Sequence, residues 1–202
     1  AIESFVSVLA NDYTKGLSLQ AIKLVFENLR NSYNYGDQES REKMHNASTM
    51  AGMAFANAFL GISHSIGHKI GGQWDQIHGR TNANLLPHIV RYNAIDPQKH
   101  ALWAKYEYFR ADEDYAEIAR YLGFKGNTTA ELVEALATEI TKLGQDIGIK
   151  MNFREQGITE EMLERDADRL AELAFEDQCT TANPKQPLIS ELKEIIYAAY
   201  KG

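Results

Sequence analysis

Three histidines lie between residues 64 and 78, and their spacing is suited to metal binding. His64 and His68 are four residues apart, so on a helix both side chains share one face. Gly71 and Gly72 are predicted to end that helix, and His78 then belongs to the next element. Because imidazole is a common ligand of zinc and ferrous iron, side chains from these two elements could meet at a single ion.

Three other interpretations of the histidines compete with this one. The spacing of His64 and His68 also resembles part of a zinc-protease helix, but Ser65 stands where the general-base glutamate is needed and Trp74 where the third ligand is needed. A second interpretation is that the histidines are structural and hydrogen-bond backbone carbonyls. A third is a self-contained site formed by His64, His68 and His78 together.

The rest of the chain predicts helices that would position these residues. Helical apolar stripes are formed by Ile2, Phe5, Val6 and Leu9 and by Leu19, Ile22, Phe26 and Leu29. A segment rich in small residues, from about 40 to 60, predicts a further helix, and no segment shows sustained alternation of period two. We therefore predict an all-α bundle of about seven to nine helices.

Start and stop signals support the helical prediction. Thr128 with Glu131 forms a capping box, and Gly144 is predicted to end the helix that this box opens. Asp112 is predicted to cap a helix over residues 113–122. Pro187 suits the first turn of a last helix that runs towards the C-terminus.

Composition excludes several classes of function. Acidic residues outnumber basic ones 28 to 21, giving a formal net charge of -7, so the overall field disfavours nucleic acid as a partner. We find neither a membrane-spanning apolar run nor a signal peptide, and we expect a cytoplasmic protein. Because Cys179 is the single cysteine, an internal disulfide is excluded and a metal would bind mainly to His, Asp or Glu.

The start of the chain suggests a fragment of a longer protein. The stripe that includes Ile2 and Phe5 begins at once, without a methionine or a capping residue before it. A processed terminus more often starts in polar, disordered sequence. We therefore expect further residues upstream of Ala1.

Longer motifs resemble the iron-dependent alcohol dehydrogenase family. They are the run from Ala54 to His68, the run His78-Gly-Arg-Thr-Asn-Ala-Asn, and the run from Phe175 to Pro184. The similarity extends over essentially the whole chain. In detail it is closest to the alcohol dehydrogenase part of bifunctional acetaldehyde-alcohol dehydrogenases.

This resemblance implies that residues 1–202 are a C-terminal helical metal-binding domain of the dehydroquinate-synthase-like fold. A nucleotide-binding domain would lie upstream, with the active site in the cleft between the two domains. Members of the family hold one divalent metal with an Asp and three His. His64 and His78 match the last two ligands. The first two, spaced Asp-x-x-x-His, should directly precede Ala1.

The resemblance also implies roles for three further residues. His68 matches a histidine beside the metal that is associated with the substrate pocket and with proton exit, so we treat it as catalytic. Phe55 matches an aromatic residue near the nicotinamide and the substrate, and Cys179 matches a cysteine near the pocket. Ile77 departs from the family, in which proline often precedes the last ligand.

The function implied is interconversion of acetaldehyde, or a similar short aldehyde, and the primary alcohol. The metal is expected to be Fe(II), with Zn(II) as an alternative, and NAD(H) would be bound mainly by the upstream domain. The isolated chain is expected to be inactive, and the whole protein is expected to form homo-oligomers and filaments. The alternative function is an autonomous helical interaction or scaffold domain whose histidines are structural.

Overall fold

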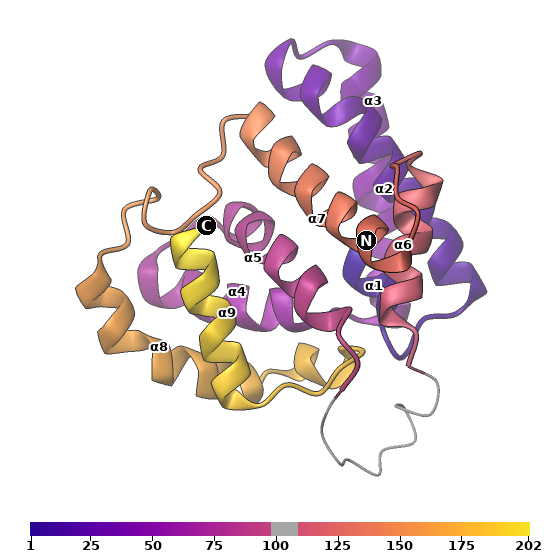
Figure 1. Ribbon diagram of the computed structural model, residues 1–202. Helices are drawn as coiled ribbons and strands as arrows, with labels where there is room; N and C mark the ends of the chain where they lie inside the picture. Colours follow the sequence, from indigo (N-terminus) through magenta and orange to yellow (C-terminus); the bar gives the residue numbers. More distant parts are fainter. Residues whose placement is uncertain (98–108) are drawn as a thin grey trace.

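The computed structural model describes residues 1–97 and 109–202, and its regular structure in these two ranges is entirely helical (Figure 1). The helices are α1 (Ile2–Val6), α2 (Asp12–Asn34), α3 (Gln38–Ala58), α4 (Ile62–Trp74), α5 (His78–Asn93), α6 (Ala111–Tyr121), α7 (Thr129–Asp146), α8 (Glu160–Phe175), the 3-10 helix η2 (Gln178–Ala182) and α9 (Ile189–Lys201). The prediction of an all-α bundle is confirmed. None of the described helices has the length and hydropathy to cross a membrane.

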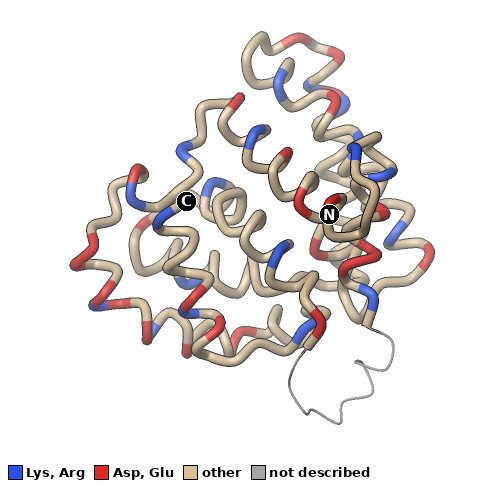
Figure 2. The backbone as a smooth tube through the Cα atoms, in the orientation of Figure 1, with Lys and Arg blue, Asp and Glu red and all other residues tan. Residues whose placement is uncertain are grey.

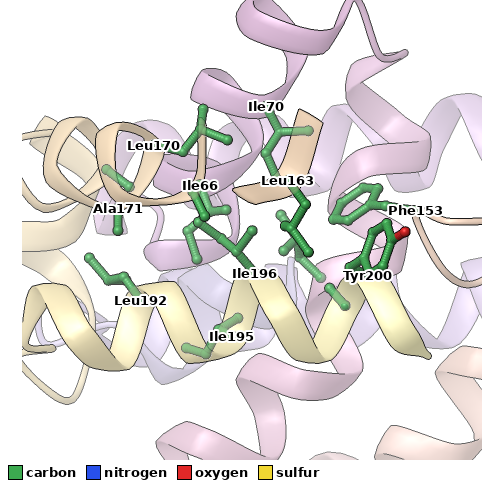
Figure 3. Packing of buried hydrophobic residues seen from close by; sticks show 14 of the residues in the cluster. Ile66, Ile70, Phe153, Leu163, Leu170, Ala171, Leu192, Ile195, Ile196 and Tyr200 are labelled. Atoms are coloured by element: carbon green, nitrogen blue, oxygen red, sulfur yellow. The ribbon is translucent and has the colours of Figure 1, made fainter. Parts of the chain in front are cut away.

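One hydrophobic cluster is formed by α4, α5, α8 and α9 and is named here the α8–α9 cluster (Figure 3). Its buried members are Ile62, Ile66, Ile70, Trp74, Leu85, Ile89, Phe153, Ile158, Leu163, Ala167, Leu170, Ala171, Ala174, Leu192, Ile195, Ile196, Ala199 and Tyr200. The apolar side of α9 packs across α4 and α8, as Figure 3 shows. The cluster therefore buries one side of α4, the helix that carries His64 and His68, along its whole length.

A second cluster, the α6–α7 cluster, joins α1, α2, α6 and α7 to the last turns of α5. Its buried members are Ile2, Phe5, Val6, Ile22, Val90, Ala111, Tyr115, Ala116, Ile118, Ala119, Leu132, Val133, Leu136, Ala137 and Ile140. Leu19 and Phe26 of the predicted stripe in α2 are half-buried against it. The consecutive residues Ile89 and Val90 belong to different clusters, so α5 connects the two.

The long helices α2 and α3 form a hairpin that projects from the rest of the molecule in Figure 1. The side chain of Asn11 caps α2 by accepting from two backbone N–H groups, and Asp37 caps α3. Acidic and basic residues are interspersed along most helices, and acidic residues predominate along α8 (Figure 2). This distribution agrees with the acidic, mixed surface that the composition indicates.

The prediction that Gly71 and Gly72 end a helix is wrong. Both lie inside α4, which continues to Trp74 and ends where Asp75 takes a left-handed conformation with φ of 50°. Trp74 is buried in the α8–α9 cluster, and its indole N–H donates to the carboxylate of Asp166 at 2.8 Å. This packing outweighs the roughly 1 kcal/mol that each glycine costs within a helix.

Gly144 likewise does not end its helix, because α7 continues to Asp146. The reversal of the chain follows at Gly148, which has a φ of +77°. A Cβ atom at Gly144 would collide with the sulfur of Met151, so the flexible Met151 side chain would have to move. The residue provides space for a neighbouring side chain.

The predicted caps have mixed outcomes. Thr128 caps α7 as expected, since its hydroxyl accepts from the backbone N–H of Glu131 at 3.2 Å. The carboxylate of Glu131 accepts from the N–H of Asn127 at 2.6 Å, one residue before the cap, so the box is not closed in the standard way. Asp112 is not a cap, because α6 begins one residue before it and Arg110 takes the cap position.

Two predictions near the ends of the chain are also wrong. Pro187 lies before α9, which begins at Ile189. Leu9 is 54% exposed, because α1 ends at Val6 and the chain leaves the helix before the fourth position of the stripe is reached.

Candidate metal centre

The structure brings the three histidines together at the junction of α4 and α5. The ring centroids of His64 and His68 are 5.9 Å apart, and those of His64 and His78 are 5.3 Å apart. His68 and His78 stack at 5.5 Å with an interplanar angle of 12°. The turn at Asp75 reverses the chain after α4, so that the first residue of α5 faces the histidine side of α4.

His64 is held by a carboxylate from the N-terminal helix α1. Its Nδ1 atom lies 2.5 Å from Oε2 of Glu3 in α1. The other carboxylate oxygen of Glu3 accepts from the backbone N–H of Ser63 at 2.7 Å. Glu3 is only 6% exposed, whereas the side chain of His64 is 26% exposed. The imidazole therefore has one buried edge and one edge that reaches the surface.

His78 is held by an amide. Nδ2 of Asn82, one turn later in α5, lies 3.1 Å from Nε2 of His78, and Oδ1 of Asn82 accepts from the hydroxyl of Ser63 at 3.0 Å. A Cβ atom at Gly67 would lie 2.8 Å from Oδ1 of Asn82, so this glycine allows α5 to approach α4. Partial burial and, to a lesser degree, the nearby His64 and His68 imidazoles lower the pKa of His78 and favour its neutral form.

His68 lies beside Asp177, Lys69 and Cys179. Nδ1 of His68 is 3.4 Å from Oδ2 of Asp177, and the ammonium of Lys69 is 2.7 Å from that same oxygen. Burial opposes ionisation of Asp177, but hydrogen bonds from Lys69 and Cys179 outweigh it, so the pKa of the carboxyl lies below its usual value. Burial, with Asp177 adjacent, raises the pKa of Cys179 to about 12, which keeps the thiol protonated.

Only one trio in the described part of the chain brings possible ligand atoms within 4.8 Å of one another: His68, Asp177 and Cys179. The ring nitrogens of the three histidines do not all lie within this distance of one another, although the rings are neighbours. The self-contained three-histidine site therefore gains no support from this arrangement. The trio itself is compromised as a metal site, because Lys69 already occupies an oxygen of Asp177.

An apolar cavity of about 210 Å³ opens beside His64. Its walls come from α1, α2, α4 and α5 and include Ile2, Ile22, Val25, Phe26 and Leu86. His64, Glu3 and Asn82 provide polar atoms at one side of it. A cavity that is apolar with a few polar groups is typical of a binding site for a small molecule.

The structure places the remaining two site candidates differently. Cys179 is buried in η2 and lies next to His68, but it is not among the residues that line the cavity beside His64. Phe55 lies on α3, is 41% exposed, and is not among the residues that line the cavity beside His64. The described residues therefore bring four of the five candidates together and leave Phe55 apart.

Sequence reasoning missed Glu3, Asn82 and Asp177 as partners of the histidines. Glu3 offered a signal, because an acidic residue within an apolar stripe needs a buried partner. Asn82 offered only its spacing of four residues after His78. Asp177 lay inside a motif that had been noted as a whole, without a role for the carboxylate.

Comparison with known proteins decides the family. Residues 1–200 match the model described as "Fe-containing alcohol dehydrogenase family, C-terminal". The chain belongs to this family.

Similar proteins in the family are several times longer than this chain. The chain is 59% identical over 202 residues to an aldehyde-alcohol dehydrogenase of Streptococcus pneumoniae serotype 4, and it spans 23% of that protein. It is 45% identical over 207 residues to the bifunctional aldehyde-alcohol dehydrogenase AdhE of Escherichia coli K12, again over 23% of that protein. It thus corresponds to about a quarter of the length of these relatives.

Solved structures of the iron-containing alcohol dehydrogenase family share the fold. The crystal structure of a 1,3-propanediol oxidoreductase superposes with a TM-score of 0.85 at 36% identity, covering 98% of this chain and 48% of that one. An alcohol dehydrogenase from Oenococcus oeni gives a TM-score of 0.86 at 34% identity, with the same coverage. The helical arrangement described above is therefore the family's C-terminal architecture.

Proposed function

We propose that this chain is the metal-binding part of an iron-type alcohol dehydrogenase that interconverts a short aldehyde, such as acetaldehyde, and its primary alcohol with NAD(H). The observation that carries the proposal is the meeting of His64, His68 and His78 at the α4–α5 junction, beside an apolar cavity. Membership of the family and the similarity to aldehyde-alcohol dehydrogenases support the same reaction.

The donor atoms at the junction fit a divalent metal such as Fe(II) or Zn(II). His64 and His78 come from two elements, and a carboxylate at Nδ1 of His64 is the usual second partner of a metal-binding imidazole. When bound, the metal would polarise the oxygen of the alcohol or aldehyde and favour the alkoxide. We propose that His64 and His78 hold it together with an Asp-x-x-x-His pair upstream of Ala1.

His68 is proposed to transfer the alcohol proton. Its Nδ1 atom faces Asp177, so Nε2 is the nitrogen available for exchange with a substrate hydroxyl. Cys179, with its raised pKa, remains a neutral thiol and forms part of the pocket wall. Phe55 is proposed to cover the nicotinamide side of the pocket, from its exposed position on α3.

NAD(H) is proposed to bind mainly to a nucleotide-binding domain outside these 202 residues. The neighbouring solved chains are about twice as long as the part that matches here, which leaves room for such a domain. Hydride transfer would then take place between that domain and the histidine junction. Homo-oligomers, including filaments, are proposed for the whole protein.

The test is metal binding by a longer form of the protein that includes the residues upstream of Ala1. We expect one Zn²⁺ or Fe²⁺ per chain, lost in His64→Ala and in His78→Ala. His68→Ala should keep the metal and lower kcat by about 10²–10⁴-fold, the range for a general acid or base. His45→Ala is the matched control, because His45 is an exposed histidine on α3.

Each contrary result identifies what is wrong. If metal remains bound in His64→Ala, the proposed ligand set is wrong. If the 202-residue chain alone binds one ion tightly and loses it in His68→Ala, the self-contained three-histidine site replaces the proposal. If no form binds metal, the histidines are structural and the scaffold function is favoured.

A further inference from the structure

We propose that Glu3 is a positioning residue, which fixes the imidazole of His64 with its proton on Nδ1 and leaves Nε2 free to bind the metal. This inference rests on the proposed function, since it assigns a partner to one of the proposed ligands. The described hydrogen bonds of the Glu3 carboxylate go to Ser63 and His64, and none goes to His68 or His78. It acts through His64.

The first step is the hydrogen bonding of the carboxylate. Oε2 of Glu3 faces Nδ1 of His64 at 2.5 Å, and Oε1 faces the backbone N–H of Ser63 at 2.7 Å. A carboxylate only accepts hydrogen bonds, so Nδ1 of His64 must carry the proton. In a neutral imidazole the other nitrogen, Nε2, is then unprotonated and able to bind a metal.

The second step is the position of α4 itself. This helix begins at Ile62, and its N-cap residue, Gly61, has no side chain to cap it. Two distant residues replace the cap: Glu3 accepts from the N–H of Ser63, and Oδ1 of Asn183 accepts from the N–H of Ile62 at 3.3 Å. A negative charge is also favoured at this end of a helix by its dipole.

The third step is the space that permits this contact. A Cβ atom at Gly61 would lie 2.9 Å from Oε1 of Glu3 and 2.8 Å from Oδ1 of Asn183. Glycine therefore allows both acceptors to reach the start of α4. Because His64 is the third residue of α4, the carboxylate that places the helix also places the ring.

A second carboxylate at a helix start shows what a purely structural role looks like. Glu131 accepts from the backbone N–H of Asn127 at 2.6 Å at the start of α7, and α7 carries no histidine. The substitution Glu131→Gln therefore removes a charged contact of the same kind without touching the candidate metal centre. It is the matched control for Glu3→Gln.

The decisive measurement is the tautomer of His64, read from long-range ¹H–¹⁵N spectra of the ¹⁵N-histidine-labelled chain without metal. The wild-type chain is expected to show the proton of His64 on Nδ1. Glu3→Gln should move it, wholly or in part, to Nε2, because the amide can present a donor to the ring; Glu131→Gln should change nothing. A wild-type His64 protonated on Nε2 overturns the proposal without any variant, even if Glu3→Gln fails to fold.

A Zn²⁺ titration of the longer form then separates this proposal from the proposed function. We expect Glu3→Gln to weaken Zn²⁺ affinity by about 10–100-fold, as loss of such an outer partner does, and Glu131→Gln to leave it unchanged. Equal affinities in wild type and Glu3→Gln overturn the positioning role. Absence of Zn²⁺ binding in the wild type itself overturns the proposed function instead, while the tautomer still reports whether Glu3 fixes the ring.

Discussion

The two hydrophobic clusters are built from similar side chains but contribute differently to the candidate metal centre. The α8–α9 cluster holds α4, on which His64 and His68 lie. The α6–α7 cluster holds α1, which supplies the carboxylate of Glu3. The imidazole of His64 and its hydrogen-bond acceptor are thus fixed by different parts of the core.

This division shows that the geometry of the centre depends on how the two clusters are joined. The connection runs through α5, where Ile89 packs into one cluster and Val90 into the other. The same helix carries His78 at its first position. Substitutions in the two clusters should therefore have similar effects on stability and different effects on the histidines.

The largest expected effect comes from cavities made in each cluster. Ile70→Ala removes a fully buried side chain of the α8–α9 cluster, and Ile118→Ala does the same in the α6–α7 cluster. Each should lower the free energy of unfolding by about 2–5 kcal/mol, measured by urea denaturation. Ile70→Ala, on α4 itself, should shift the ring signals of His64 and His68 more than Ile118→Ala does. Equal shifts from both variants would contradict the comparison.

A smaller effect is expected from the polar contact that holds the end of α4. Trp74→Phe removes the buried N–H that donates to Asp166 at 2.8 Å while keeping most of the aromatic packing, including the contact with Phe153. The expected loss of stability is about 1–3 kcal/mol, because a buried hydrogen bond to a charged carboxylate is lost, although Arg165 still donates to the same oxygen. A loss within experimental error would show that packing alone fixes this end of α4.

The same contact predicts how the α8–α9 cluster responds to acid. Hydrogen bonds from Arg165 and, less strongly, from Trp74 lower the pKa of Asp166 from 3.8 to about 2. The ionised form therefore stabilises the fold above about pH 4, and this contribution is lost as the pH falls towards 2. Urea denaturation at pH 5 and at pH 3 should show a smaller pH dependence in Asp166→Asn. An unchanged dependence would contradict this prediction.

The smallest effect is expected at the surface link between α5 and α7. Both guanidinium contacts from Arg91 to Glu134 are short, at 2.7 and 2.6 Å, but both side chains are well exposed. Glu134→Gln should lower stability by about 0.2–1 kcal/mol, and less at high salt. The long pair Lys142–Glu139, at 3.9 Å, is the control, and Glu139→Gln should have no measurable effect.

The sequence predicted the helical class and the grouping of histidines well, because both depend on local periodicity. On any helix that includes both residues, His64 and His68 lie on the same face, wherever that helix ends. The helix ends themselves were less predictable. Gly71 and Gly144 are typical of a helix end, yet both lie inside helices, and burial of Trp74 holds the end of α4 beyond Gly71.

The partners of the histidines were beyond a sequence-only prediction for a different reason. Glu3 and His64 are separated by 61 residues, and His68 and Asp177 by 109. Contacts of this kind depend on how the clusters pack, which periodicity does not specify. Resemblance to a family identified residues one at a time, and it offered no role for Glu3 or Asn82.

The start of α4 has a consequence for the order of folding. Its two acceptors come from positions 60 and 121 residues away along the chain, one before it and one after it. Closing such long loops is entropically unfavourable until other contacts have formed, so we expect this helix end to be a late event. During synthesis it would wait until residue 183 has left the ribosome. Pulse-labelled hydrogen exchange should accordingly show the amide of Ser63 protected after the amides in the middle of α7, and earlier protection would contradict this order.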